Sequence, residues 1–157
     1  MEDTLLVRRA MLIQYEIDLK MNRLIELMRD LVDKPQAAAS QMEKHQIGNL
    51  LEVATGTDSV ELVKNFIQYQ IGRDVSGKSW RANTFGDRLI QLIDRDVKEI
   101  AGAIAGKVAE KAKPKKLDDA GVQALTDEIW IGLVRQLVGQ MNRYFYYQKE
   151  AQRWSKR

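Results

Sequence analysis

The chain contains no cysteine, only two prolines and a single histidine among its 157 residues. The lack of cysteine excludes disulfides, thiolate catalysis, Cys-zinc sites and iron–sulfur clusters, and a single histidine excludes paired-histidine metal motifs. An absence of cysteine is typical of a reducing compartment, so we expect a cytoplasmic protein. Because proline is scarce, long stretches of the chain are free to form helices.

Long hydrophobic runs are missing as well. The first residues, MEDTLLVRR, mix acidic, apolar and basic side chains, so they predict neither a signal peptide nor a membrane span. Hydrophobic residues make up 45% of the chain and charged residues 30%, which is the balance of a globular, helix-rich protein. The length suits one domain. We therefore predict a single soluble domain over residues 1–157 that makes no contact with a membrane.

Apolar residues recur every three or four positions in most of the chain, which is the spacing of one helix face. Pro35, Gly56, Gly72 and Pro114 interrupt this pattern, because proline stops helices and glycine commonly follows their ends. The expected helices span about residues 3–33, 36–55, 58–72, 84–108 and 118 nearly to the C-terminus. The predicted fold class is all-α: a compact bundle of about five helices, with long N- and C-terminal helices and basic connecting loops at 72–84 and 112–118.

Two features of these helices bear on packing. In the first helix, Leu6 and Ala10 begin an apolar stripe that continues to Leu31 and is expected to face a partner along its whole length. In the fourth helix, Gly102 and Gly106 lie among alanines. Interior glycines weaken a helix, so they indicate either a close approach of another helix or simple tolerance in a long helix.

The sharpest motif is Gly72-Arg73-Asp74-Val75-Ser76-Gly77-Lys78-Ser79, which has the letters of a phosphate-binding P-loop, GxxxxGKS. In a true P-loop the backbone amides bind phosphates on a loop between a buried strand and a helix. Here the preceding segment has helical spacing, and no other segment predicts the strands of a parallel sheet. A solvated basic loop is therefore favoured, and nucleotide binding is kept as the weaker alternative.

Nothing else in the sequence points to catalysis. His45 lies next to Glu43 and Lys44 with no serine on a strained turn, so it is expected to be solvated and not a general base. Carboxylates at helical spacing, such as Asp96 and Glu99, have lysine or arginine close by and indicate surface ion pairs. We expect no enzyme activity, no catalytic residue, no bound metal and no cofactor.

Charge is unevenly distributed along the chain. The segments Lys107 to Lys116 and Arg143 to Arg157 each have a formal charge of +4, although the whole chain is only +3. A smaller basic stretch lies in the 72–84 loop. The C-terminal segment also interleaves its cations with tyrosines and Trp154. Cations neutralise phosphates and aromatic rings stack on unpaired bases, which is what a nucleic-acid surface needs. A solubilising basic tail, with its aromatic rings in the core, is the equally weighted alternative.

The candidate nucleic-acid-binding residues are Arg73, Lys78, Arg81, Lys111, Lys113, Lys115, Lys116, Arg143, Tyr146, Lys149, Arg153, Trp154, Lys156 and Arg157. Because the fourth and fifth helices should pack antiparallel, we expect the two +4 segments at opposite ends of the bundle.

The segment from Asp58-Ser59 through Asn65-Phe66-Ile67 and the aromatic Phe145-Tyr146-Tyr147 resemble the small all-helical subunit of multisubunit CRISPR effector complexes, especially of type III. The resemblance implies a helical bundle that lines a ribonucleoprotein filament. Such a subunit contacts its own copies and steadies guide and target nucleic acid without cutting it.

These patterns lead to one function and one rival. The leading hypothesis is a non-catalytic subunit that binds RNA or single-stranded DNA within a larger assembly, together with other protein subunits or its own copies. The rival is a protein–protein adaptor, or a scaffold that self-associates through its long first helix and uses its basic ends only for solubility.

Overall fold

The structure is a computed structural model, and it describes residues 2–111 and 117–156. The α-helices are α1 (Glu2–Asp33), α2 (Lys44–Thr55), α3 (Val60–Arg73), α4 (Phe85–Leu92), α5 (Lys98–Lys111) and α6 (Asp119–Ser155). Short 3₁₀ turns cover Ala37–Ala39 and Ala82–Thr84, and a π-helical segment covers Ile93–Val97. The described residues contain no strand, so the all-α prediction is confirmed.

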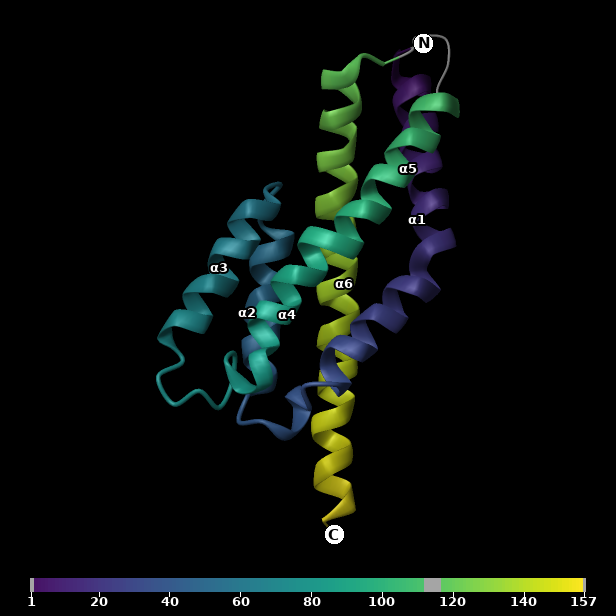
Figure 1. Cartoon of the computed structure of the whole chain (residues 1–157). Helices are drawn as coiled ribbons and strands as arrows, with labels where there is room; N and C mark the ends of the chain where they lie inside the picture. Colours follow the sequence, from purple (N-terminus) through teal and green to yellow (C-terminus); the bar gives the residue numbers. More distant parts are fainter. Residues whose placement is uncertain (1, 112–116, 157) are drawn as a thin grey trace.

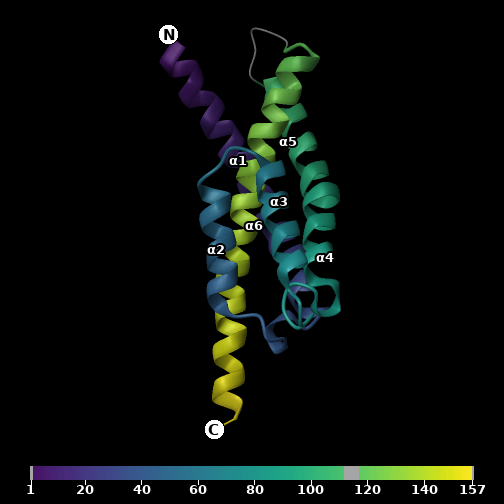
Figure 2. The ribbon, with the colours of Figure 1, turned by 90° about the vertical axis from the view of Figure 1, so that its left-hand side faces the viewer.

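The long helix α6 is the axis of the bundle. It packs against α1, α2 and α5, while α3 lies outside α2 and packs on α4 (Figure 1). Residues buried at three- and four-residue steps along α6, from Leu125 through Leu133 to Phe145, belong to a core cluster that takes in side chains from all six α-helices. The last turns of α6 extend past the other helices, so their side chains are largely exposed (Figures 1 and 2).

The helices α4 and α5 form one continuous rod that corresponds to the predicted fourth helix. The π-helical segment joins them, and the indole Nε1 of Trp130 donates a hydrogen bond to the main-chain oxygen of Ile93 at 3.0 Å. Trp130 is almost fully buried on α6. The irregular turn of the α4–α5 rod is thus anchored to the central helix by a buried side chain.

The predicted helix over 36–55 is wrong in its first half. Ala37–Ala39 form a 3₁₀ turn, and α2 begins only at Lys44. Gln36, which has a left-handed backbone, directly precedes the turn, and at its end Ser40 is extended while its hydroxyl donates to the carbonyl of Ala37. The regular helix starts where Glu43 and Gln46 form a capping box.

The predicted stripe of α1 is buried only from its middle onward. Ile17, Leu24 and Leu31 are in the core, whereas Leu6 and Ala10 are exposed. The first turns of α1 lean away from α5 and α6 (Figure 2), so nothing in the described residues covers Leu6. The expectation that the stripe faces a partner along its whole length is therefore wrong for these turns.

Of the two interpretations of the small residues in α5, the structure supports tolerance of glycine. A Cβ built at Gly102 or Gly106 would meet nothing within 4 Å, so neither glycine marks a close helix approach. Ala101 and Ala105 make the buried contact instead. The one tight position is Gly86 in α4, where a Cβ would lie 2.5 Å from the side chain of Ile71.

Candidate nucleic-acid interface

Three segments distant in sequence meet at the end of the bundle opposite the N-terminus (Figure 1). These are residues 33–44 after α1, residues 73–88 around the loop between α3 and α4, and residues 142–156 of α6. We call their common surface the basic end. Hydrogen bonds hold the three segments together. The Gln41 amide donates to the carbonyl of Lys78 at 2.8 Å, and the Lys149 ammonium donates to the carbonyl of Ser40 at 2.9 Å.

The charge of the basic end differs sharply from that of the rest of the molecule. Its three segments hold ten lysines and arginines against five aspartates and glutamates, a formal charge of +5. The other described segments together carry −6, and four further cations lie outside the described residues. The described part of the protein is therefore strongly dipolar, with its positive pole at this end.

The side chain of Asp74 builds the loop between α3 and α4. Its carboxylate accepts hydrogen bonds from the backbone amides of Ser79 at 3.1 Å and Arg81 at 2.9 Å, and the Ser76 hydroxyl lies 3.4 Å away. Burial alone would raise the pKa of Asp74, but these hydrogen bonds outweigh it and hold the pKa below its usual value. The loop conformation thus depends on the ionised carboxylate.

This arrangement gives the GxxxxGKS letters a different role from that of a P-loop. The amides of Ser79, the last residue of the segment, and of Arg81 just after it point at the chain's own carboxylate, where a P-loop would direct amides at phosphate. The segment follows helix α3 and not a strand, and only Gly77 has a positive φ, at 69°. The favoured interpretation as a basic loop fits the structure. Lys78 is exposed on this loop, whereas the Arg81 guanidinium donates back to the main-chain oxygen of Asp74 at 3.3 Å.

The end of α6 supplies exposed aromatic rings. Tyr146, Tyr147 and Trp154 are each between 56% and 60% exposed, although aromatic side chains are usually mostly buried. The rings of Tyr147 and Trp154 meet edge to face at 6.4 Å, and the Lys44 ammonium lies 4.2 Å from the centre of the Tyr146 ring. The interpretation of rings in this segment as core residues holds for Phe145, which is fully buried, and for Tyr144, which packs against the core, but it is wrong for the exposed Tyr147.

The predicted cations of α6 are not equivalent. Arg143 and Lys156 are exposed, and no acidic partner occurs for either among the described residues. Arg153 pairs with Glu150 at 3.3 Å, and Lys44 pairs with the same carboxylate at 2.6 Å. The hydrogen bond from Lys44 is the main cause that lowers the pKa of Glu150.

Lys149 has a structural role instead. Its side chain is half-buried beside Phe145, and burial lowers the pKa of its ammonium. The bond to Ser40 ties the turn before α2 to α6. The linear pattern groups Lys149 with the exposed cations because it does not show that this side chain lies beneath the turn.

Lys111 lies at the other end of the molecule. Its ammonium is 2.9 Å from Glu16 of α1, and Lys107 is 3.9 Å from the same carboxylate. The hydrogen bond that Lys111 donates to the Glu16 carboxylate raises the pKa of Lys111. Because α5 and α6 run antiparallel, their ends lie at opposite ends of the bundle, as expected (Figure 1). Lys113, Lys115, Lys116 and Arg157 lie outside the described residues.

The basic end holds three cations that the sequence pattern does not single out: Lys34, Lys44 and Arg88. Each lies in a segment of mixed charge, and only the fold brings them to the same end of the bundle as Lys78 and Arg143 (Figure 1). The Arg88 guanidinium donates to the main-chain oxygen of Asn83 at 3.2 Å, which keeps it close to the loop.

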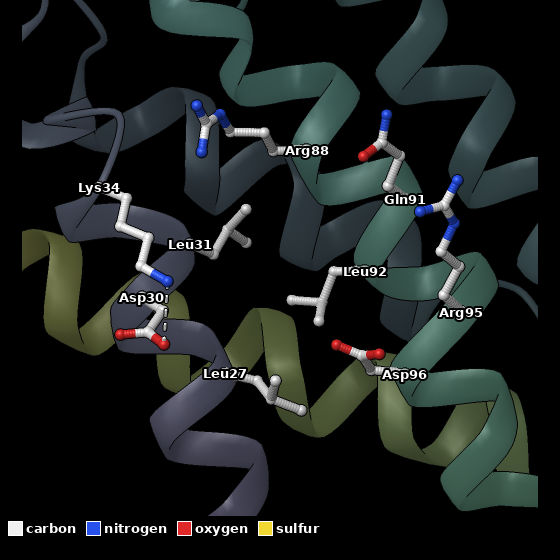
Figure 3. Close-up of a pocket in the computed structure, with 9 residues that line it drawn as sticks. All are labelled: Leu27, Asp30, Leu31, Lys34, Arg88, Gln91, Leu92, Arg95 and Asp96. Carbon is white, nitrogen blue, oxygen red and sulfur yellow. Dashed lines mark ion pairs between the residues drawn. The ribbon is translucent and has the colours of Figure 1, made fainter.

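A groove of about 400 Å³ borders the basic end between α1 and the α4–α5 rod. Three leucines, Leu27, Leu31 and Leu92, lie between the two walls (Figure 3). Charged groups of both signs surround them, and Lys34 pairs with Asp30 of the same wall at 3.6 Å. The mixed charge makes the groove a weak anion site by itself. The described residues contain no cluster of three potential metal ligands.

Comparisons of the chain with protein-family models, with curated proteins and with solved structures give no significant match. None of the described helices is both long enough and apolar enough to cross a bilayer. The described residues therefore define the protein only as an all-α bundle with a basic, aromatic end.

Proposed function

We propose that the basic end binds RNA or single-stranded DNA without cleaving it. One observation carries the proposal: three distant segments converge to place a formal charge of +5 beside three exposed aromatic rings. Phosphates are bound by such cations with release of counterions, and every base has a face that can stack on an aromatic ring. A purely solubilising tail would not require exposed rings.

The individual residues suit different parts of a nucleic-acid strand. Lys78, Arg143 and Lys156 are exposed and have no acidic partner among the described residues, so they are free to contact phosphates. Tyr147 and Trp154 offer faces for bases on the projecting part of α6. Stacking requires unpaired bases, so we expect single strands to bind more tightly than duplexes. The dipolar charge favours an approach with this end first.

The test is fluorescence anisotropy of labelled single-stranded oligonucleotides at several salt concentrations. Replacing Lys78, Arg143 and Lys156 by alanine together should weaken binding by on the order of tenfold or more, similarly for unrelated sequences. The slope of log affinity against log salt should flatten by about 0.7 for each phosphate of a single strand that the variant no longer neutralises. A matched control, Lys20→Ala with Arg23→Ala, removes two cations of α1 outside the basic end and should change neither quantity.

The aromatic contribution is tested separately. Tyr146→Ala or Trp154→Ala should cost about 1 to 3 kcal/mol for single strands and almost nothing for duplexes. Tyr15→Ala removes an equally exposed ring on α1, 56% exposed and outside the basic end, and serves as the control. Binding that ignores salt and all of these substitutions would contradict the proposal and leave the adaptor hypothesis.

Membership of a larger assembly is part of the same proposal. It is supported by the resemblance to the small helical subunit of type III CRISPR complexes, since such a subunit binds nucleic acid without catalysis. Native purification should then recover the protein with other subunits and with nucleic acid, and nuclease treatment should lower the ratio of absorbance at 260 to 280 nm. Recovery with proteins but without nucleic acid would favour an adaptor.

A further inference from the structure

The first half of α1 presents an apolar face to solvent. Val7, Met11, Tyr15 and Leu19 are spaced four residues apart and are between 56% and 67% exposed. They lie on the side of α1 opposite the core residues Ile17 and Leu24. Four large apolar side chains in one row are more than the scattered exposure of a usual monomer surface, and they mark a place where another molecule packs.

The order of the residues along this face indicates which molecule packs against it. Thr4, Arg8, Met11, Tyr15, Asp18 and Asn22 follow one another at alternating steps of four and three, which places them along a single line on the helix. Among the described residues neither Arg8 nor Asp18 has an ion-pair partner, and Asp18 accepts only a hydrogen bond from Gln14.

This line of residues is self-complementary when a second copy of α1 runs in the opposite direction. If a second α1 packs antiparallel so that Arg8 faces Asp18, then Met11 faces Tyr15 in the same register. Thr4 likewise faces Asn22, whereas Val7 and Leu19 lie on opposite flanks of the line and border the contact on either side. A two-fold axis repeats each contact, so both unpaired charges of both copies find partners, and Met11 and Tyr15 pack against each other at the centre.

We propose that the protein forms a two-fold symmetric homodimer through this face of α1, in an antiparallel register that pairs Arg8 of each copy with Asp18 of the other. The contact is small, because one helix face offers several hundred Å² against roughly 800 Å² per partner in a standard interface. The dimer is therefore expected to be reversible. The antiparallel arrangement directs the two basic ends away from each other, so dimerisation does not cover them.

The first test is the oligomeric state, measured by sedimentation velocity over a range of protein concentrations. The wild-type chain should show a concentration-dependent dimer. Met11→Glu should raise the dimer dissociation constant by on the order of 100-fold or more, because it buries an unpaired charge between apolar side chains. Leu62→Glu on α3, where the leucine is 49% exposed, is the matched control and should leave the dimer unchanged. Circular dichroism verifies that each variant folds.

The register has a sharper test in charge exchange. Arg8→Asp alone should weaken the dimer by roughly tenfold or more, because it places like charges opposite each other, and adding Asp18→Arg should restore it. Because the chain has no cysteine, an introduced cysteine is the single thiol available for site-specific cross-linking. With a short bifunctional maleimide, an equimolar mixture of Thr4→Cys and Asn22→Cys should cross-link far better than either variant alone, because in this register the same position of the two copies is about 27 Å apart along the helices.

Several results would overturn the proposal. The wild-type chain could remain monomeric at all concentrations, or the dimer could be lost in Leu62→Glu and kept in Met11→Glu. Failure of Asp18→Arg to rescue Arg8→Asp would exclude this register. A monomer that co-sediments with anionic vesicles through the same α1 residues would assign the face to a lipid surface instead.

Discussion

Replacing Asp74 by alanine should destabilise the protein and loosen the loop that carries Lys78 and Arg81. The carboxylate accepts hydrogen bonds from two backbone amides, at 3.1 and 2.9 Å. Each hydrogen bond to a charged group contributes about 1.5 to 3 kcal/mol to the free energy of unfolding. Because two bonds to one carboxylate are not additive, we expect a loss of about 2 to 4 kcal/mol in the free energy of unfolding. For a chain of this length that corresponds to a fall in Tm of about 5 to 15 °C.

The pH dependence follows from the direction of the pKa shift. Because the folded state holds the pKa of Asp74 below its unfolded value, the ionised carboxylate stabilises the fold at every pH above about 4. This contribution disappears as the pH falls through the lowered pKa. The difference between the wild type and Asp74→Asn should therefore be constant from about pH 5 to 8 and shrink at lower pH.

Urea unfolding followed by circular dichroism measures both effects. The control is Glu110→Ala, which removes an exposed carboxylate and should change stability by less than about 0.5 kcal/mol. If Asp74→Ala were no more destabilising than this control, the carboxylate would not hold the loop. A difference from Asp74→Asn that persisted unchanged to the lowest pH would refute the pKa argument.

Three further predictions concern packing and the loop. Glu16 is almost fully buried while Lys111 is half-exposed, so Lys111→Ala should destabilise the fold by leaving a buried carboxylate without this partner. Adding Glu16→Leu to the same chain should recover the stability, as measured by thermal melts. Gly86→Ala should cost about 1 to 3 kcal/mol by overpacking, whereas Gly102→Ala, which meets open space, should gain about 0.5 to 1 kcal/mol; urea unfolding giving both the same sign would contradict the packing described. Calorimetric titration should detect no ATP binding by the wild type or by Lys78→Ala, and measurable binding by the wild type would revive the nucleotide-binding alternative.

Much of the fold can be predicted from the sequence because helical periodicity is a local property. The fourth predicted helix matches the α4–α5 rod closely, yet nothing in its sequence indicates the π-helical segment. That irregular turn is anchored by Trp130, a residue far away in the chain. The start of α2 is misplaced for a related reason: three alanines favour a helix, but they form only a short turn, which Gln36 with its left-handed backbone precedes and Ser40 ends.

The candidate site is harder to predict than the fold. Runs of lysine and arginine identify cations, but they do not show which of them the fold neutralises. Lys111 is paired with Glu16, and Lys149 lies against the turn at Ser40. Conversely, Lys34 and Arg88 join the basic end only because α1 ends, and α4 begins, beside the same loop. Packing between segments distant in the sequence decides which charged side chains remain free to contact a ligand. The pattern of a single sequence does not reveal that packing.

The most direct test of the basic end as a nucleic-acid interface is to map where a nucleic acid touches the protein. A photoactivatable uridine-rich single strand, cross-linked to the wild-type chain and analysed by mass spectrometry, should attach to peptides that contain Tyr146, Tyr147 or Trp154 and to the loop between α3 and α4. Nuclease-resistant adducts confined to these peptides are the predicted result. Cross-links concentrated on α3 or on the first half of α1, or none above the level of an unrelated acidic protein, would contradict the assignment.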